Sequence, residues 1–314
     1  MSVPREPDLQ DDDVALRRRD FDGAVTTESD SVTFLVEHQG QLAGTVEVRR
    51  LGGGNGEVLW AVLPDHRGQG VTARAVRLLI GFAFTELGLH RVVAYADPED
   101  HASLRTAGRA GLRREGLVRA AGERAAQGSG QGSGQRPERR DRVQLARLAT
   151  DPEPTTRDGF IGVLNAGLPT KRAISQGLIR HSAGEILLCE LSYKNEWDLP
   201  GGVVDPHESP AHAVVREIRE EMQIDVVPQS LVAVNWLPSW RGWDDAVLFV
   251  FDLGLHDDVI AEARLEPAEL RSLHWCTLED AERRAAPYVT RMLRRLARQT
   301  NGTAYLEDGS DPGW

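Results

Sequence analysis

The sequence has 314 residues, 40% of them hydrophobic and 27% charged, and carries a formal net charge of −11 at pH 7. This length favours two globular domains, and the composition excludes a wholly disordered chain. A nucleic-acid polymer is not expected as a partner, because binding phosphates needs a basic surface. No apolar run is long enough to cross a membrane, and residues 1–13 lack the apolar core of a secretory signal. We therefore expect a cytoplasmic protein.

The first half is predicted to form short strands around one amphipathic helix. Residues 32–37 and 42–48 flank a turn that contains glycine, which indicates a β-hairpin. A further strand is expected at 57–63, where Pro64 ends it. From residue 71 to 87 the apolar residues recur at helical spacing. A strand over 90–96 follows this helix.

A Gly/Ser-rich tract at 127–135 is typical of a flexible segment. Residues 142–148 after the tract still have the pattern of a strand, which can pair back near Leu117. The tract is therefore predicted to be a loop inside the first domain, since lengthening a loop costs little free energy. We place the domain boundary at 151–157, where two prolines follow the last strand, and assign residues 1–150 to the first domain.

The second domain is assigned to residues 157–300, and residues 301–314 are expected to be a tail. Strands are predicted at 173–179, 186–191, 231–236 and 246–253, with an amphipathic helix near 288–298. Strands mixed with a few helices predict an α/β (α+β) fold for both domains. Cys189 and Cys276 lie in apolar stretches and are expected to be buried thiols.

Residues 209–222 have the pattern of a helix, with Ser209 as N-cap and a proline in its first turn. Glu217 and Glu221 then lie one above the other, with Glu220 beside them. Clustered carboxylates repel one another, and a hard cation such as Mg²⁺ relieves that repulsion. Taken alone, residues 216–221 are more simply explained as a charged, solvated helix face.

The residues around this helix change that interpretation. Gly202, Glu208, the run 216–221 and Ile224 stand at the offsets of G-x5-E-x7-R-E-U-x-E-E-x-G-U. The pattern resembles the Nudix box at every specified position except Gln223, where the family has glycine. Because many residue types agree at fixed spacing, the signal is specific. The resemblance covers roughly residues 159–298 and implies a Nudix α/β/α sandwich.

The resemblance also implies roles for individual residues. Mg²⁺, with Mn²⁺ as a substitute, would be held by Gly201, Glu217, Glu220 and Glu221. Gly202 belongs to the same box, and Glu208 with Arg216 would form a salt bridge that joins the loop to the helix. The catalytic set would be Glu217, Glu221 and Glu269, the last as general base, with Glu266 as its competitor.

Three tryptophans, Trp236, Trp240 and Trp243, lie close together in the sequence after this helix. One of them can stack on a nucleobase. Equally, Trp236 can belong to the core while the other two cover a loop.

In the first half, a glycine-containing turn between a strand and a helix leaves backbone amides open at the helix start. The turn and the sequence that follows it resemble GNAT-type N-acetyltransferases over about residues 14–148. This resemblance implies a reduced GNAT-like mixed sheet with helices. By this resemblance acetyl-CoA would contact Val62, Arg67, Gly68, Gln69, Gly70, Val71 and Thr72.

The first half also departs from the GNAT pattern. The family has about sixty residues before the first hairpin, and this chain has about thirty. Asp100 stands where asparagine is usual, and Ala107 where many relatives carry a tyrosine acid. Ser103 is the candidate acid that remains.

The leading hypothesis is a Mg²⁺-dependent Nudix hydrolase that cleaves the pyrophosphate of a nucleoside diphosphate derivative, behind an acetyltransferase-like domain that binds acyl-CoA. One alternative is a bifunctional N-acetyltransferase and Nudix protein with acetyl transfer as a main activity. Another is a nucleotide and CoA sensor with weak catalysis. The expected partner is a small-molecule nucleotide, and the family resemblance allows a homodimer.

Overall fold

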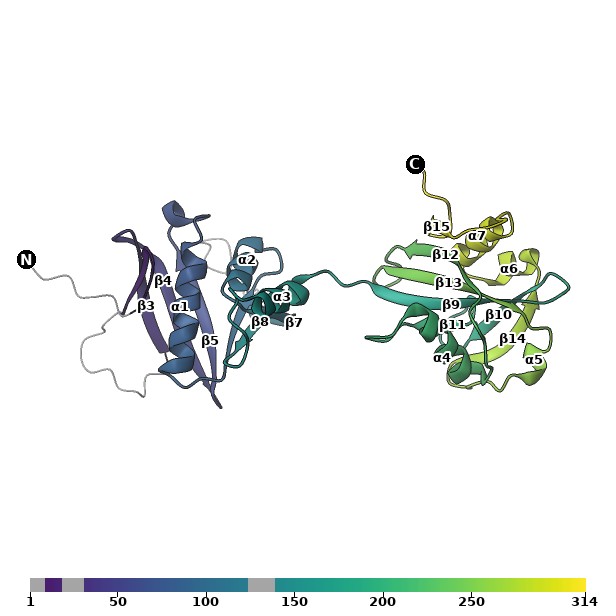
Figure 1. The fold of residues 1–314 in the computed structure, drawn as a ribbon, viewed down its shortest axis with the longest axis horizontal. Helices are drawn as coiled ribbons and strands as arrows, with labels where there is room; N and C mark the ends of the chain where they lie inside the picture. The colour runs from purple at the N-terminus through teal and green to yellow at the C-terminus, as the bar shows by residue number, and fades with distance from the viewer. Residues whose placement is uncertain (1–8, 19–30, 124–138) are drawn as a thin grey trace, which may run out of the picture. The chain divides into compact units, whose positions relative to one another are not determined.

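The computed structural model describes residues 9–18, 31–123 and 139–314. Its contacts divide the chain into two compact units, Met1–Pro169 and Thr170–Trp314 (Figure 1). The predicted Gly/Ser-rich loop at 127–135 lies outside the described residues.

The first unit is built on one eight-stranded sheet in the order β1-β2-β3-β4-β5-β6-β8-β7. Its strands are β1 (Leu9–Asp11), β2 (Val14–Arg18), β3 (Ser31–His38), β4 (Gln41–Gly52), β5 (Asn55–Val62), β6 (Arg91–Ala96), β7 (Arg113–Glu123) and β8 (Arg139–Leu148). Among the described strands of this sheet, only β5 and β6 pair in parallel. Leu117 pairs with Val143, which confirms the predicted return of the chain after the Gly/Ser tract.

The β5–β6 pair is short. It joins only residues 55–57 of β5 to residues 91–93 of β6, although β5 continues to Val62. Beyond Glu57 the two strands therefore separate, and the β6 side of β5 has no strand partner among the described residues.

Helix α1 (Val71–Thr85) packs on β4 and β5 (Figure 1) and buries Val76, Leu79 and Ile80. The ring of Phe82 meets Phe34 of β3 edge to face at 5.2 Å. The 3₁₀ turn η1 (Pro64–His66) joins β5 to this helix, and α2 (His101–Arg109) follows β6. The predicted amphipathic helix is confirmed, and its apolar stripe forms the core of this unit.

Helix α3 (Arg157–Gly167) lies in the first unit, so the boundary between the units falls after Pro169 and not at the predicted 151–157. It packs against β7 and α2, and Gly162 lies against the guanidinium of Arg113. Sequence patterning misses this helix because Phe160 and Leu164 are largely exposed, which leaves it without a regular buried stripe. The helix therefore belongs to the first unit.

The second unit has a seven-stranded sheet in the order β14-β10-β9-β13-β12-β15, with β11 paired to β9. The strands are β9 (Arg172–Arg180), β10 (Ile186–Leu191), β11 (Gly201–Val203), β12 (Ser230–Leu237), β13 (Ala246–Leu255), β14 (Leu270–Cys276) and β15 (Ala304–Glu307). Strand β15 pairs in parallel with β12 and buries Leu306. The expected tail at 301–314 was therefore wrong, because part of it completes the sheet.

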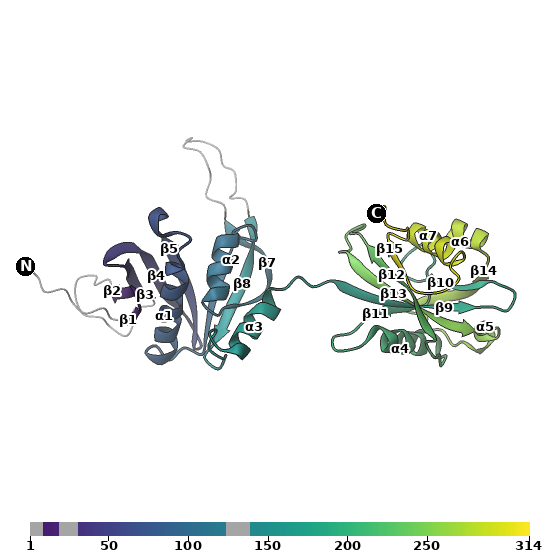
Figure 2. The same cartoon turned by 45° about the horizontal axis from the view of Figure 1, so that its top comes forward.

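Helix α4 (Pro210–Met222) covers one face of this sheet, and α6 (Leu278–Arg284) with α7 (Pro287–Leu296) covers the other (Figure 2). Two apolar clusters follow these faces, one around Ile218 and Met222 and one around Val289 and Met292. The short α5 (Val259–Glu262) closes the α4 side. The predicted α/β/α sandwich is confirmed.

Cys189 and Cys276 are both buried and free, as expected. None of the helices in the described part of the chain is long and apolar enough to cross a membrane.

Candidate functional site

The sequence of α4 fixes where the helix begins and ends. The Ser209 hydroxyl accepts a hydrogen bond from the amide of His212, and Pro210 occupies the first turn. At the other end Gln223 adopts φ 55°, the left-handed conformation that glycine prefers. The predicted helix is confirmed, and its carboxylates are held in a fixed register.

Three carboxylates meet at the edge of α4. One oxygen each of Glu217, Glu221 and Glu269 lies within 4.8 Å of the others. Glu217 and Glu221 come from successive turns of α4, whereas Glu269 immediately precedes β14. Backbone bonds hold Glu269 in place, because its carbonyl accepts from Ser192 at 2.8 Å and its amide donates to Glu266 at 3.0 Å. Of the two candidates from the sequence, the structure brings Glu269 to the cluster.

Glu221 is the most constrained member of the cluster. Its side chain is 4% exposed, and its Oε2 has no hydrogen-bond partner among the described residues. Burial, followed by the charges of Glu217 and Glu269, raises the pKa of Glu221 to about 8, against a smaller opposing effect of the Gly201 amide. A buried carboxylate oxygen without a donor is costly unless a cation satisfies it. The donor set therefore fits a hard divalent metal.

Two glycines allow the chain to pass beside these carboxylates. A Cβ on Gly202 would lie 2.5 Å from the carboxylate of Glu217. Gly201 has φ +128°, and a Cβ there would meet the carbonyl oxygen of Ser175 at 2.3 Å. A side chain at position 201 would meet backbone, so that position requires glycine, whereas a side chain at position 202 would displace the carboxylate of Glu217.

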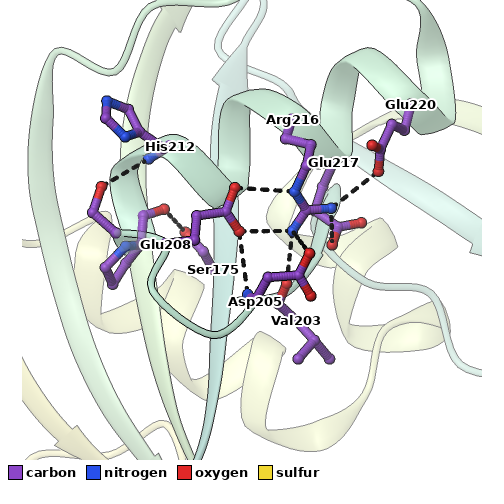
Figure 3. A network of polar contacts seen from close by, with 10 residues as sticks. Ser175, Val203, Asp205, Glu208, His212, Arg216, Glu217 and Glu220 are labelled. Carbon is purple, nitrogen blue, oxygen red and sulfur yellow. Dashed lines mark hydrogen bonds and ion pairs between the residues drawn. The ribbon is translucent and has the colours of Figure 1, made fainter.

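Arg216 joins the loop before α4 to the helix (Figure 3). Its Nε and Nη2 donate to the two oxygens of Glu208 at 3.0 and 2.9 Å, and Nη2 also donates to the carbonyl of Val203 at 3.0 Å. This bidentate pair is the contact expected from the sequence. The hydrogen bond from Arg216 lowers the pKa of Glu208.

Arg216 also reaches the helix carboxylates. Its Nη1 donates to Glu217 at 2.9 Å and to Glu220 at 3.0 Å (Figure 3). Glu220 has 60% of its side chain exposed and points to Arg216. It was expected beside Glu217 and Glu221 as a ligand, but the structure does not bring it into the cluster of three carboxylates.

The loop between β10 and β11 borders the same cluster. Asp198 is buried there and accepts hydrogen bonds from Tyr288 at 2.8 Å, from the amide of Leu199 at 2.9 Å, and from Lys194. Tyr193 in this loop is largely exposed, and partial desolvation with the negative charges of Asp198, Glu221 and Glu269 raises the pKa of its hydroxyl. The sequence reasoning did not single out Asp198 or Tyr288. The sequence signal for Asp198 was its position directly before Leu-Pro-Gly-Gly, between apolar residues.

The three tryptophans divide between two environments. Trp236 is partly buried, and its indole N–H donates to Asp245 at 3.2 Å. Trp240 and Trp243 are 48% and 58% exposed in the β12–β13 connection. The guanidiniums of Arg241 and Arg172 lie over these two indoles at 4.2 and 4.8 Å.

In the first unit a cavity of about 130 Å³ lies at the start of α1. The predicted residues Gly68, Gly70 and Thr72 line it, and within the described part of the chain no side chain caps the first turn of this helix. Arg105 and Arg109 of α2 line its other side and were not predicted. Their spacing of four residues was the available signal, but helix α2 had not been recognised.

The remaining predicted residues of this unit are not part of the cavity lining. Val62 ends the part of β5 that has separated from β6, while Arg67, Gln69 and Val71 alternate with the lining residues. The amide of Ser103 donates to Asp100 at 3.0 Å, which caps helix α2. The structure therefore gives Ser103 a capping contact and does not place it in the cavity lining.

Comparison with known proteins assigns a family to each unit. Residues 171–296 match the NUDIX domain model, and residues 2–113 match the Acetyltransferase (GNAT) domain model. The probable N-acetyltransferase YjcK of Bacillus subtilis is 43% identical over 54 residues, which cover 17% of this chain and 30% of that protein. The putative ADP-ribose pyrophosphatase YjhB of the same organism is 40% identical over 68 residues, which cover 22% and 32%.

Among solved structures, the MutT protein from Methanosarcina mazei Go1 is 28% identical, with a TM-score of 0.38. The match covers 43% of this chain and all of that one. The chain spans only about a third of the length of the curated relatives named above. The GNAT match lies within the first structural unit and the NUDIX match within the second, so this chain carries a GNAT acetyltransferase domain followed by a Nudix domain.

Proposed function

We propose that the second unit is a Mg²⁺-dependent hydrolase that cleaves the pyrophosphate linkage of a nucleoside diphosphate derivative. One observation carries this proposal: Glu221 is buried with an unpartnered oxygen inside a cluster of three carboxylates. Such an arrangement destabilises the fold unless a cation binds. The proposal agrees with relatives whose names include a putative ADP-ribose pyrophosphatase and a putative 8-oxo-dGTP diphosphatase.

The metal would be held by Glu217 and Glu221, with Gly201 beside them and Glu269 at the edge of the same cluster. When bound, Mg²⁺ polarises phosphoryl oxygens and lowers the pKa of water. Glu220 directly precedes Glu221 in the sequence and is held by Arg216. If its side chain released Arg216, it would reach either a second metal ion or the face of the first ion that is turned to the substrate. Mn²⁺ offers the same preference for oxygen ligands and would substitute.

The side chains of the unit then have separate tasks. Glu269 is exposed at the rim of the cluster, and we assign it the removal of a proton from the attacking water. Water adds to one phosphorus and the bridging P–O bond breaks, so that the phosphates are divided between the two products and each keeps at least one. The Arg216–Glu208 pair keeps the loop of Gly202 against α4, so that the carboxylates stay in register.

The test is turnover of a panel containing dNTPs, oxidised dGTP, NADH, ADP-ribose and nucleotide sugars. We expect Mg²⁺-dependent release of a nucleotide from at least one compound, and a loss of about 10²-fold or more in the Glu221→Gln variant. Absence of turnover with every compound, or full activity in that variant, contradicts the proposal.

For the first unit we propose acyl-CoA binding at the cavity beside α1. The supporting observation is the open start of this helix, which faces Arg105 and Arg109 across the cavity. Backbone amides and guanidiniums are the groups that bind phosphates. Calorimetric titration with acetyl-CoA tests this, and an absence of binding contradicts it. Acetyl transfer as a main activity, or a sensor role, would follow only from such binding.

A further inference from the structure

A chain of hydrogen bonds leads from a carboxylate in the first unit to the cavity beside α1. Asp13 lies between β1 and β2, and its Oδ2 lies 2.9 Å from Nε2 of His38. The Nδ1 of His38 lies 3.3 Å from Nδ1 of His66, which also lines the cavity. His38 is 7% exposed, so water does not compete freely for these contacts.

The ionised state of Asp13 fixes the direction of these bonds. Arg74 forms an ion pair with Asp13, and its hydrogen bond is the main cause that lowers the pKa of that carboxyl. A carboxylate only accepts, so Nε2 of His38 must carry a proton. In neutral His38, Nδ1 is then an acceptor, and Nδ1 of His66 must donate to it. The other nitrogen of His66, Nε2, then carries no proton and has no hydrogen-bond partner among the described residues. Because His66 lines the cavity, we assign Nε2 as the acceptor that meets a ligand there.

One added proton changes Nε2 of His66 from a hydrogen-bond acceptor to a donor. If His66 takes the proton, its Nε2 carries hydrogen directly. If His38 takes it, Nδ1 of His38 donates to His66, and the hydrogen of His66 moves to Nε2. Both arrangements present an N–H group to the cavity, and Asp13 balances the charge. Histidine is the side chain that makes such a change near neutral pH.

The surroundings of the cavity favour an anion. Its lining contains Arg105 and Arg109 from α2 and, among the described residues, no carboxylate. Asp13 is engaged on the far side of His38 with Arg74, which also approaches Asp12 at 3.9 Å. Asp65 and Arg67 flank His66 in the chain, and both are exposed. The groups that face a ligand here are therefore cations and amides.

We infer that His66 is a direct ligand of an anionic group, such as a phosphate of coenzyme A, and that binding this group brings one proton from solvent onto the His38–His66 pair. The inference deepens the acyl-CoA binding proposed for the first unit and is independent of the hydrolase. Such coupling makes affinity depend on pH, because a bound proton is part of the complex.

The test is calorimetric titration of the full chain with coenzyme A, with EDTA present, in buffers that differ in ionisation enthalpy. The wild type is expected to take up one more proton per CoA than His66→Asn, which keeps an N–H donor and exchanges no proton. Where the free pair is unprotonated, wild-type Kd rises about tenfold per pH unit relative to this variant.

Two outcomes separate the proposals. If CoA does not bind, both the acyl-CoA proposal and this inference fail. If CoA binds with equal proton uptake in wild type and His66→Asn, only the inference fails. Nitrogen-15 NMR of the histidine rings in the wild type is independent of any effect of the variants on folding. It should show neutral His66 protonated at Nδ1, and a proton at Nε2 instead would overturn the inference.

Discussion

Replacing Glu221 with glutamine should stabilise the second unit in the absence of metal while abolishing its response to Mg²⁺. Glutamine has the same shape and no charge, so it removes the repulsion from Glu217 and Glu269. It also removes the cost of a buried, unpartnered carboxylate oxygen. The direction is unusual, because most substitutions at buried positions destabilise a protein.

The size of the effect follows from the pKa of Glu221, which rises from 4.5 to about 8 on folding. A raised carboxyl pKa means that the folded state binds the proton of Glu221 more tightly than the unfolded state does. This carboxyl therefore contributes its full stabilisation below the unfolded pKa of 4.5, and the contribution is lost as pH rises towards 8. By about pH 7 the loss is on the order of 3 kcal/mol. For a unit of this size that corresponds to a Tm shift of roughly 6–12 °C.

The assay is thermal unfolding followed by tryptophan fluorescence, which reports mainly on the second unit because only Trp60 lies in the first. Unfolding is measured with EDTA and with Mg²⁺, from about pH 5 to about pH 8. Glu220→Gln is the matched control, since this neighbouring side chain is exposed and lies outside the cluster of three carboxylates. The reasoning is refuted if metal-free Glu221→Gln is no more stable than wild type near neutral pH, or if Mg²⁺ stabilises both equally.

Three further predictions concern single positions. Gly202→Ala should weaken Mg²⁺ binding about tenfold or more in calorimetry, because the new Cβ would lie 2.5 Å from the Glu217 carboxylate. Gly313→Ala is the control, since open space surrounds Gly313 and its substitution should leave the affinity unchanged. Equal Mg²⁺ affinities of the two variants would contradict this prediction. Gln223→Gly should raise the free energy of unfolding by about 1 kcal/mol by relieving a left-handed φ of 55°, and an unchanged or lower Tm would argue against strain there. Glu269→Gln should lower kcat about 10²-fold or more while metal affinity changes far less, and a parallel loss of affinity would make Glu269 a ligand rather than the base.

The sequence predicted those parts of the fold whose patterns are local. The strands at 32–37 and 42–48 and the helix at 71–87 alternate or repeat at their own periods, and the structure contains them. The short strands β1 and β2 lie in a charged region. They become strands because β2 pairs with β3 and β1 pairs with β2. Strand β15 similarly exists because it joins β12. Tertiary pairing of this kind leaves no periodic signal in a short segment.

The same distinction holds for the site. Glu208 and Arg216 were placed correctly because the loop and helix between them have a fixed length. Glu217 and Glu221 point together because they are one helical turn apart. Glu220 has a different direction on the helix and is drawn to Arg216, which sequence spacing alone does not reveal. The contact of Asp13 with His38 joins residues 25 positions apart and depends on the pairing of β2 with β3.

The central claim is that a divalent metal binds at the cluster of Glu217, Glu221 and Glu269, with Glu217 and Glu221 as its carboxylate ligands. Its most direct test is anomalous diffraction from crystals of the full chain soaked in Mn²⁺. The account predicts a manganese peak between these three carboxylates, and no such peak in Glu221→Gln. Manganese bound elsewhere, with none between the three carboxylates of the wild type, would contradict it.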